Sequence, residues 1–180
     1  MKHKVIDNFL DEEYFNSLVI LFTDGVLVDV KNDGKIKLPW YFRNEITSNH
    51  NVAEDNLFYM IHMFYIQNTP ASPFYDKLIP LLEKLEVKCL IRIKGNLFPN
   101  TETLHEHAMH IDYDFPHSGA ILSMNTCDGY TKLKDGTKID SVANRILLFD
   151  ASRNHCSTTT TNVSARFNIN INYIQVQEKK

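Results

Sequence analysis

Ten residues in the middle of the chain, HEHAMHIDYD at positions 105–114, contain three histidines and two aspartates. Imidazole and carboxylate groups at this density are typical ligands of a divalent metal ion. In an extended segment, residues i and i+2 project to the same side, so we expect His110 and Asp112 to lie side by side. An HxD pair alone is a weak signal, because motifs this short also arise by chance. A metal site needs at least one further ligand from elsewhere in the chain.

His155 is the candidate for that ligand. It is the only histidine after His117, and it opens a β-rich run that leads on to Arg166. In an antiparallel pair this spacing can bring the guanidinium near the metal site, where it would suit a carboxylate. Two histidines and one carboxylate on one face of an octahedral ion leave the other positions open, as in non-haem Fe(II) oxygen chemistry. An acidic co-substrate that chelates the metal and pairs with Arg166 would use both features.

The composition limits the function classes. The chain has 180 residues, 43% of them hydrophobic and 23% charged, which suits one globular domain spanning 1–180. The net charge of −3 gives no basic surface for nucleic acid or an anionic membrane. The sequence contains no apolar run of signal-peptide or transmembrane length. Three cysteines without a CxxC motif indicate reduced thiols, so we expect a cytoplasmic protein.

The first part of the chain, residues 1–86, mixes helix and strand signals and is expected to support the rest. Residues 7–22 predict a short opening strand and then a helix capped by Asp11. A hairpin is expected over 26–38, around the turn NDGK. A second helix over 72–86 should be bent or interrupted near Pro80. The polar stretch 40–56 is a candidate lid.

Residues 87–176 change in character and predict a β-rich core. Eight short runs are separated by turn signals, with no helical period between them: 87–98, 107–113, 119–125, 129–133, 137–142, 145–150, 155–161 and 165–176. We therefore expect a mainly β fold with flanking helices (α+β), in which the eight strands form a sandwich or a jelly-roll barrel. The N-terminal helices should pack on one sheet.

The last run shows how the two faces of that sheet should differ. Arg166, Asn168, Asn170 and Asn172 alternate with apolar residues that end at Tyr173. The apolar face should meet the helices. The polar face should look into a cavity.

Several segments together resemble a known family. The HID, H and RFN motifs at His110, His155 and Arg166, with the stretches 90–99 and 121–150, are similar to the 2-oxoglutarate and Fe(II)-dependent dioxygenases. This resemblance implies that the eight strands form a double-stranded β-helix, the jelly-roll or cupin-like core of that superfamily. Within that superfamily the chain looks most like the small prolyl-4-hydroxylase-like oxygenases of bacteria and bacteriophages. The opening segment VIDNFLD also fits them. The resemblance is strong over 88–174 and looser before it.

The resemblance implies roles for particular residues. His110, Asp112 and His155 would bind Fe(II), and Arg166 would pair with the distal carboxylate of 2-oxoglutarate. Asn168 stands where many relatives have Ser or Thr. Two further residues would contact the co-substrate by the same analogy: Ser123, where many relatives carry Tyr, and Asn96 on the first core strand.

Other polar residues have two readings each. His105 and His107 have no part in the site, or they stand at its entrance or orient a metal ligand from behind. Asp114 continues the His110 and Asp112 face and is either a second-shell partner or a substrate contact. We expect His117 to be solvated. We expect Arg92 and Lys94 to lie on a solvated strand face, and Cys127 and Cys156 to be buried as small hydrophobic residues. We expect the aromatic residues of the N-terminal part to lie in the core and its cover: Trp40, Tyr41, Phe42, Phe58, Tyr59, Phe64 and Tyr65.

The implied reaction consumes O₂ and 2-oxoglutarate, releases succinate and CO₂, and hydroxylates an unactivated C–H bond. Ascorbate would serve as reductant, and Asp112 favours hydroxylation because related halogenases have Gly or Ala there. The substrate is expected to be a prolyl or other residue of a peptide or protein, or a small molecule. One alternative is a non-catalytic metal-binding jelly-roll or cupin-like module. The other, nucleic-acid demethylation, is disfavoured because such enzymes carry a second Arg where this chain has Asn172.

Overall fold

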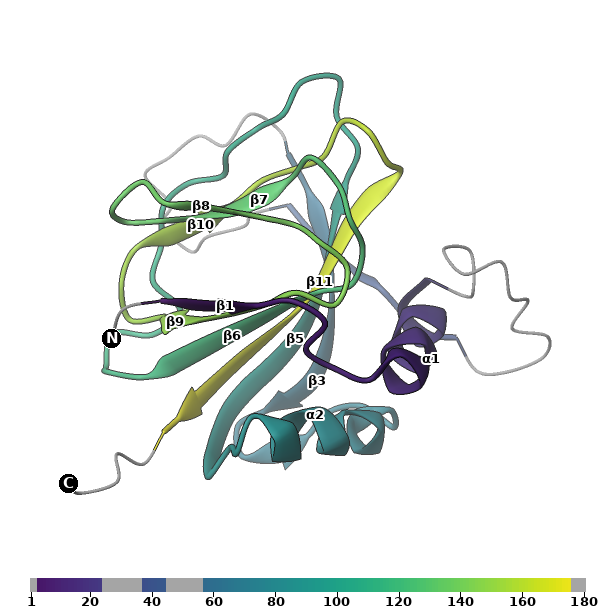
Figure 1. The fold of residues 1–180 in the computed structure, drawn as a ribbon, viewed down its shortest axis with the longest axis vertical. Helices are drawn as coiled ribbons and strands as arrows, with labels where there is room; N and C mark the ends of the chain where they lie inside the picture. The colour runs from purple at the N-terminus through teal and green to yellow at the C-terminus, as the bar shows by residue number, and fades with distance from the viewer. Residues whose placement is uncertain (1–2, 24–36, 45–56, 176–180) are drawn as a thin grey trace.

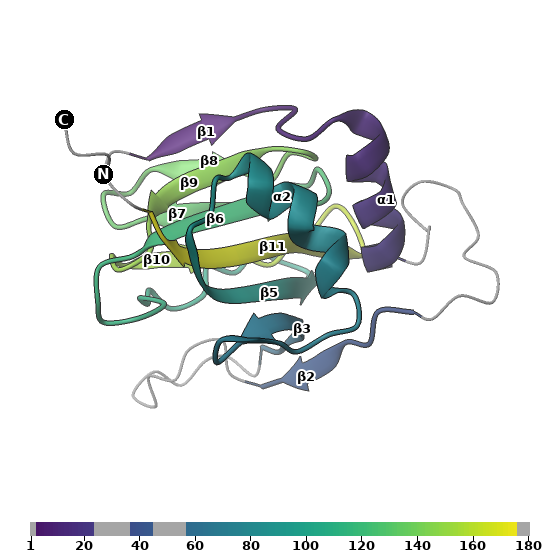
Figure 2. The ribbon, with the colours of Figure 1, turned by 90° about the horizontal axis from the view of Figure 1, so that it is seen from below.

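The computed structural model describes residues 3–23, 37–44 and 57–175. The predicted hairpin at 26–38 and the candidate lid at 40–56 lie largely outside these ranges. Figure 1 shows a large antiparallel sheet with a smaller sheet above it, and Figure 2 shows the helices against the other face of the large sheet. The mainly β architecture with flanking helices is the one expected from the sequence.

The described N-terminal part supplies two α-helices, one 3-10 helix and four strands. Their bounds are β1 Lys4–Ile6, α1 Glu12–Thr23, β2 Tyr41–Arg43, β3 Tyr59–Ile66, β4 Thr69–Pro70, the 3-10 helix η1 Tyr75–Leu78, and α2 Ile79–Lys84. Helix α1 begins after Asp11, whose Oδ1 accepts a hydrogen bond from the backbone N of Tyr14 at 3.0 Å. This is the predicted N-cap. The predicted interruption near Pro80 is also present, since η1 gives way to α2 there.

The remaining strands form the core. They are β5 Cys89–Pro99, β6 Ser118–Ser123, β7 Tyr130–Leu133, β8 Lys138–Asp140, β9 Ile146–Asp150, β10 His155–Ser157 and β11 Ala165–Ile174. The large sheet has the order β1-β9-β6-β11-β5-β3-β2, with β4 paired to β3, and the small sheet has the order β10-β7-β8. Every pairing between these strands is antiparallel.

One of the eight expected core runs is not a regular strand. The segment 107–113 pairs with its neighbours only through isolated bridges, the nearest of which joins His110 to His155. A second bridge joins Glu106 to Thr158 just before it. Between the two bridges His107 N still donates to Ser157 O at 2.9 Å, whereas the Ala108 carbonyl faces Nδ1 of the His110 ring at 3.2 Å.

The last strand divides the interior as its alternation predicts. Phe167, Ile169, Ile171 and Tyr173 belong to the main apolar core, which also contains Leu18 of α1. A separate, smaller core lies between β6, β9 and the small sheet, and includes Ile121, Ile139, Leu147 and Phe149. The polar side of β11 therefore faces the space between the two sheets.

The aromatic residues of the N-terminal part divide between core and surface. Phe64 is fully buried, and Trp40 packs against the main core. Tyr41 and Phe42 on the edge strand β2 are 58% and 61% exposed, and Phe58 is 40% exposed, so the expectation that the whole set forms core and cover was wrong for these three. The side chains of Tyr41 and Phe42 leave the core because β2 pairs on one side only, with β3. Among the described residues, no helix is both long and apolar enough to cross a membrane.

Candidate metal centre and co-substrate pocket

Two backbone hydrogen bonds set His110 and His155 opposite each other. His110 N donates to His155 O, and His155 N donates to His110 O, both at 2.9 Å. Residues that exchange both bonds in an antiparallel pair lie directly across from one another. The two imidazole ring centres are consequently 4.7 Å apart. His155 begins β10, whereas His110 comes from the irregular segment that precedes β6.

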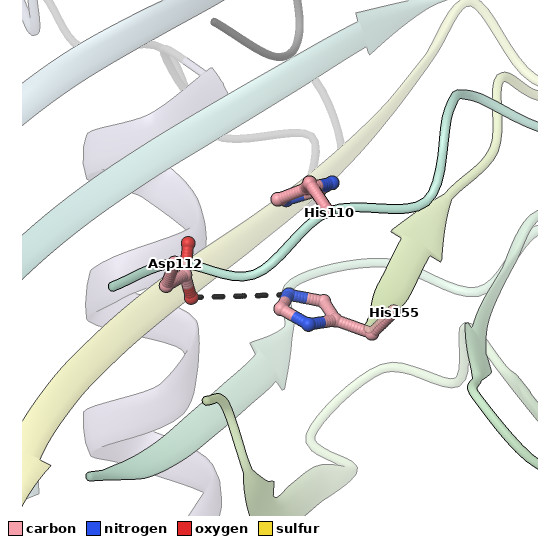
Figure 3. A group of neighbouring side chains, drawn as sticks. All are labelled: His110, Asp112 and His155. Carbon is pink, nitrogen blue, oxygen red and sulfur yellow. Dashed lines mark ion pairs between the residues drawn. The ribbon is translucent and has the colours of Figure 1, made fainter. Parts of the chain in front are cut away.

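Asp112 joins the two histidines from the same segment as His110. Its backbone N donates to Ala151 O at 3.2 Å, which brings the carboxylate toward the pair. One ligand atom from each of the three residues lies within 4.8 Å of the others, and Figure 3 shows the side chains converging. Asp112 Oδ2 is 3.8 Å from His155 Nε2. The structure therefore brings together the three residues that the sequence singled out as metal ligands.

The protonation states of these groups suit a divalent cation. The Nδ1 atoms of His110 and His155 face the carbonyl oxygens of Ala108 and Arg153, at 3.2 Å and 3.0 Å. A carbonyl can only accept, so each Nδ1 carries the proton and each Nε2 keeps a lone pair for a metal. Burial lowers the pKa of His110 to about 4 and also lowers the pKa of His155, so both rings are neutral at pH 7.

Asp112 remains ionised although it is buried. Burial by itself raises its pKa, but Arg92, His155 and Lys94 together hold the pKa below its usual range. Arg92 Nη2 donates to Asp112 Oδ1 at 2.6 Å. Two neutral imidazoles and one carboxylate form the mixed nitrogen and oxygen donor set that Fe(II) accepts. The residues present thus fit an iron ion.

A polar pocket extends from the histidines between the two sheets. It is lined by, among others, Lys94, Asn96, Thr131, Ser157, Asn168 and Asn170. The register of β5 against β11 produces this lining, because Asn96 lies across from Asn168 and Lys94 lies across from Asn170. Asn96 Nδ2 donates to Asn168 Oδ1 at 2.8 Å. Asn96 and Asn168, both predicted to contact a co-substrate, therefore stand on the pocket wall as a pair.

Arg166 lies behind the end of this pocket that is remote from Asp112. Its side chain is only 1% exposed, and its guanidinium donates to Ser157 Oγ at 2.5 Å and to Thr131 Oγ1 at 3.0 Å. Those two hydroxyls line the pocket, whereas Arg166 itself is covered by them. Burial lowers the pKa of Arg166 to about 10, which still leaves the group charged at pH 7. Its Nε has no hydrogen-bond partner in the described part of the chain.

The prediction that Lys94 and Arg92 lie on a solvated strand face was wrong. Lys94 lines the pocket, with its ammonium 5.5 Å from the centre of the Tyr59 ring, and burial followed by repulsion from Arg92 lowers its pKa to about 8. The alternation along β5 was read correctly, but its polar side faces the cavity because β5 pairs with the polar-faced β11. Within the described residues Lys94 forms no ion pair.

Arg92 also bears on the argument against demethylases. The sequence disfavours a demethylase because this chain has Asn172 where those enzymes carry a second Arg. The structure places Arg92 directly across from Asn172, so the neighbouring strand supplies a guanidinium next to Asp112. The candidate metal centre therefore has an arginine beside Asp112 even though position 172 is Asn.

The remaining predicted residues divide into buried and exposed groups. Ser123 is buried on β6 across from Asn168 but is not among the residues that line the pocket. His107 is buried against Phe98, with ring centres 5.4 Å apart, and its pKa falls to about 3, chiefly through burial and then through Arg166. His105 is half-buried, and Asp114 is exposed.

His117 was expected to be solvated, and this was wrong. The side chain is buried, with Nδ1 2.8 Å from Phe115 O, and it packs among Tyr113 and Phe115. The turn after Pro116 folds its ring inward because two neighbouring aromatic rings offer a packing site. Cys127 and Cys156 are buried, as predicted.

Known structures share this arrangement of strands and helices. A prolyl hydroxylase from Trichoplax adhaerens, in complex with a hypoxia inducible factor oxygen degradation domain peptide, matches with a TM-score of 0.62 and 15% identity over 96% of this chain and 83% of that one. An oxidoreductase of the 2OG-Fe(II) oxygenase family from Burkholderia pseudomallei matches with a TM-score of 0.65 and 9% identity over 96% and 84%. The viral collagen prolyl hydroxylase of Paramecium Bursaria Chlorella virus-1, in its 2OG complex, gives 0.56 and 12% over 98% and 97%.

This chain has the fold of the 2-oxoglutarate and Fe(II)-dependent oxygenases. The sequence itself matches no protein-family model and no curated protein. At these identities the likeness concerns the oxygenase fold, and the chemistry has to be argued from the residues of the pocket.

Proposed function

We propose that this protein is a 2-oxoglutarate- and Fe(II)-dependent dioxygenase that hydroxylates an unactivated C–H bond. The observation that carries the proposal is one pocket with metal ligands His110 and His155 on its wall, Asp112 beside them, and a buried guanidinium behind its far end. Bound at the three ligands, Fe(II) would couple the decarboxylation of 2-oxoglutarate to substrate oxidation by O₂. Ascorbate would keep the iron reduced.

The charges of the pocket support an acidic co-substrate. Arg166 is a buried cation and Lys94 a partly buried one, and neither forms an ion pair with a carboxylate in the described part of the chain. Buried cations are costly unless an anion accompanies them. A dicarboxylate would supply that charge. We assign its distal carboxylate to the Arg166 end, where the hydroxyls of Thr131 and Ser157 face the pocket.

The amide wall would orient the co-substrate between those ends. Asn96 and Asn168 hold each other by a hydrogen bond, so their side chains are fixed before any ligand binds. Asn96 Oδ1 has no partner in the described residues. We retain Asn168 and Asn96 as proposed contacts. Ser123 would act indirectly, through its place beside Asn168 on the neighbouring strand.

A peptide or protein substrate is the proposed target, with a prolyl residue as the first candidate. The structural neighbour from Trichoplax adhaerens binds a peptide. Aromatic residues that include Tyr59 and Phe98 line the pocket, which suits the ring of a proline. A small-molecule substrate would compete with this proposal, and candidate compounds can be tested in the same assay.

Succinate formation tests the proposal directly. Purified protein is mixed with Fe(II), ascorbate and 2-oxoglutarate under air, with and without proline-containing peptides, and succinate is quantified while the peptides are weighed by mass spectrometry. We expect succinate in the complete mixture and a mass gain of one oxygen atom on the accepted peptide. Asp112→Ala is the inactive control. If neither succinate nor 2-oxoglutarate-dependent iron binding occurs, the proposal is refuted and the alternative of a non-catalytic metal-binding module is favoured.

A further inference from the structure

Both oxygens of the Asp112 carboxylate are already engaged by polar donors. Oδ1 accepts from Arg92 Nη2 at 2.6 Å, and Oδ2 accepts from Asn172 Nδ2 at 2.8 Å and from Asn170 Nδ2 at 3.3 Å. The carboxylate side chain is 4% exposed, so these donors, and not water, fix its orientation. The two oxygens have different surroundings, and this difference decides which of them a metal can reach.

Oδ2 is the oxygen that faces the histidines. It lies 3.8 Å from His155 Nε2, the ring atom whose lone pair is free. Oδ1 is the oxygen that bonds the guanidinium. A metal cation approaching Oδ1 would meet a charged N–H donor on that oxygen and a like charge close behind it. Only Oδ2 is therefore open to a metal at the triad.

The register of two strands produces this clamp. Asn172 lies directly across from Arg92, and Asn170 is the next inward-facing residue of β11. Because a carboxylate only accepts hydrogen bonds, both amides must turn their Nδ2 toward Asp112. Their Oδ1 atoms are left buried and without a partner among the described residues. Leaving two buried amide oxygens without hydrogen-bond donors costs free energy, which indicates that the orientation of both amides serves to hold the carboxylate.

Arg92 is itself held in place. Its guanidinium carbon lies 5.2 Å from the centre of the Tyr113 ring, and Tyr113 packs against Phe115 and His117. The aromatic residues that follow the HxD motif thus support the cation that grips its aspartate. A cation over an aromatic face in a partly buried setting is a favourable, directional contact.

The geometry points to Arg92 as a positioning residue that restricts Asp112 to one-oxygen coordination. This inference rests on the proposed metal site. Two imidazoles and a single carboxylate oxygen fill three positions of an octahedral ion and leave three, enough for a chelating 2-oxo acid and one further ligand. A carboxylate bound through both oxygens would leave only two. Arg92 therefore preserves the position that a reaction with both co-substrates requires.

Counting the water molecules on bound Mn(II) tests this role without any turnover. The protein is loaded with saturating Mn(II), and the broadening of the electron paramagnetic resonance lines in ¹⁷O-enriched water gives the number of bound waters. We expect three waters in the wild-type protein and two in Arg92→Met, where Asp112 is free to bind through both oxygens. Arg92→Lys keeps a cation at the position and should return the count to three.

Arg145→Met is the matched control, because it breaks the Arg145–Asp7 ion pair away from the pocket and should keep three waters. Three waters in Arg92→Met would overturn the inference, and so would a folded Arg92→Met protein that binds no Mn(II). If Arg92→Met does not fold, Arg92→Gln, which retains a polar side chain, is measured in its place, and two waters bound to Mn(II) are again expected. Failure of the wild-type protein to bind Mn(II) would instead refute the metal site itself.

Discussion

At the scale of single residues, the carboxylate of Asp112 has two tasks. It is the proposed oxygen ligand, and it also neutralises Arg92 and accepts from two asparagine amides in a buried setting. Removing it leaves one charge and two amide donors without their acceptor, which costs more than the loss of a surface ion pair. Asp112 therefore contributes to the stability of the metal-free fold as well as to metal binding.

Asp112→Ala should consequently fail in two measurements. We expect Mn(II) or Co(II) affinity to fall at least 100-fold, because even loss of a residue that only orients a ligand costs about 10–100-fold. The free energy of unfolding of the metal-free protein should fall by about 1–3 kcal/mol, measured by urea denaturation. Asp114→Ala is the control on the same segment, since Asp114 is exposed. Equal metal affinity in the two variants would refute the ligand assignment.

Gly129 controls the space around Arg166. A Cβ at this position would lie 2.7 Å from Arg166 Cδ and 2.7 Å from the backbone O of Thr159. The backbone oxygen cannot yield easily, so in Gly129→Ala the arginine side chain has to move. We expect 2-oxoglutarate affinity to fall several-fold with Mn(II) affinity unchanged, as measured by calorimetry.

Gly136→Ala is the comparison for that variant. Gly136 has φ of +89° in the turn between β7 and β8, and a Cβ there meets nothing within 4 Å. An alanine at this φ is strained by about 1 kcal/mol or more. It should lower thermal stability yet leave 2-oxoglutarate binding intact. If Gly129→Ala also binds 2-oxoglutarate normally, Arg166 is not the group that holds its carboxylate.

At the scale of elements, helix α1 and the pocket lie on opposite faces of the large sheet. Leu18 of α1 is 1% exposed in the main core, whereas the pocket residues stand on the other side of β5 and β11. Leu18→Ala should destabilise the fold by about 2–5 kcal/mol through lost burial and a residual cavity. Mn(II) affinity at a temperature where the variant is folded should not change.

Ser17→Ala, one position earlier on the exposed side of α1, is the control and should alter stability by less than about 0.5 kcal/mol. Urea denaturation gives both values. A large loss of metal affinity in folded Leu18→Ala would show that the helices do more than cover the sheet.

The strands also show which structural features the sequence predicts and which it does not. The alternation along residues 165–176 identified the polar and apolar faces of β11, because each face meets a different environment. The same alternation on β5 also predicts a polar and an apolar face, but the expectation that the polar face meets solvent was wrong. Lys94 and Arg92 look like surface residues when one strand is considered alone. Only the pairing of β5 with β11 shows that this side of β5 faces the space between the sheets, where Arg92 pairs with Asp112 and Lys94 lines the pocket.

The three proposed ligands were accessible from the sequence for different reasons. His110 and Asp112 follow from their spacing, which holds even though their segment is an isolated bridge rather than a strand. His155 stood out as the only histidine after His117, at the start of a β-rich run that leads to Arg166, and the family resemblance supported it, although nothing local reveals that it pairs with a residue 45 positions earlier. The support that Arg92 gives to Asp112 could not be predicted, since it depends on contacts among three separate segments.

At the scale of the whole molecule, the stability of the metal-free protein should depend on pH through its buried histidines. In the folded protein the pKa of His107 is lowered to about 3 and that of His110 to about 4, mainly by burial. In the unfolded chain both return to about 6.5. Above pH 6.5 neither state binds the protons. Between pH 6.5 and 4 the unfolded chain binds them and the folded protein does not, so acid favours unfolding.

We therefore expect the free energy of unfolding, measured with urea in the presence of a chelator, to fall as the pH drops from 6.5 to 4. Each histidine can contribute up to about 1.4 kcal/mol per pH unit. His107→Gln removes one of these groups at a position away from the proposed metal ligands, so its stability should decline less steeply with acid than that of the wild type. Parallel curves for the two proteins would show that His107 takes up its proton without unfolding, and that the site beside Arg166 is open to water.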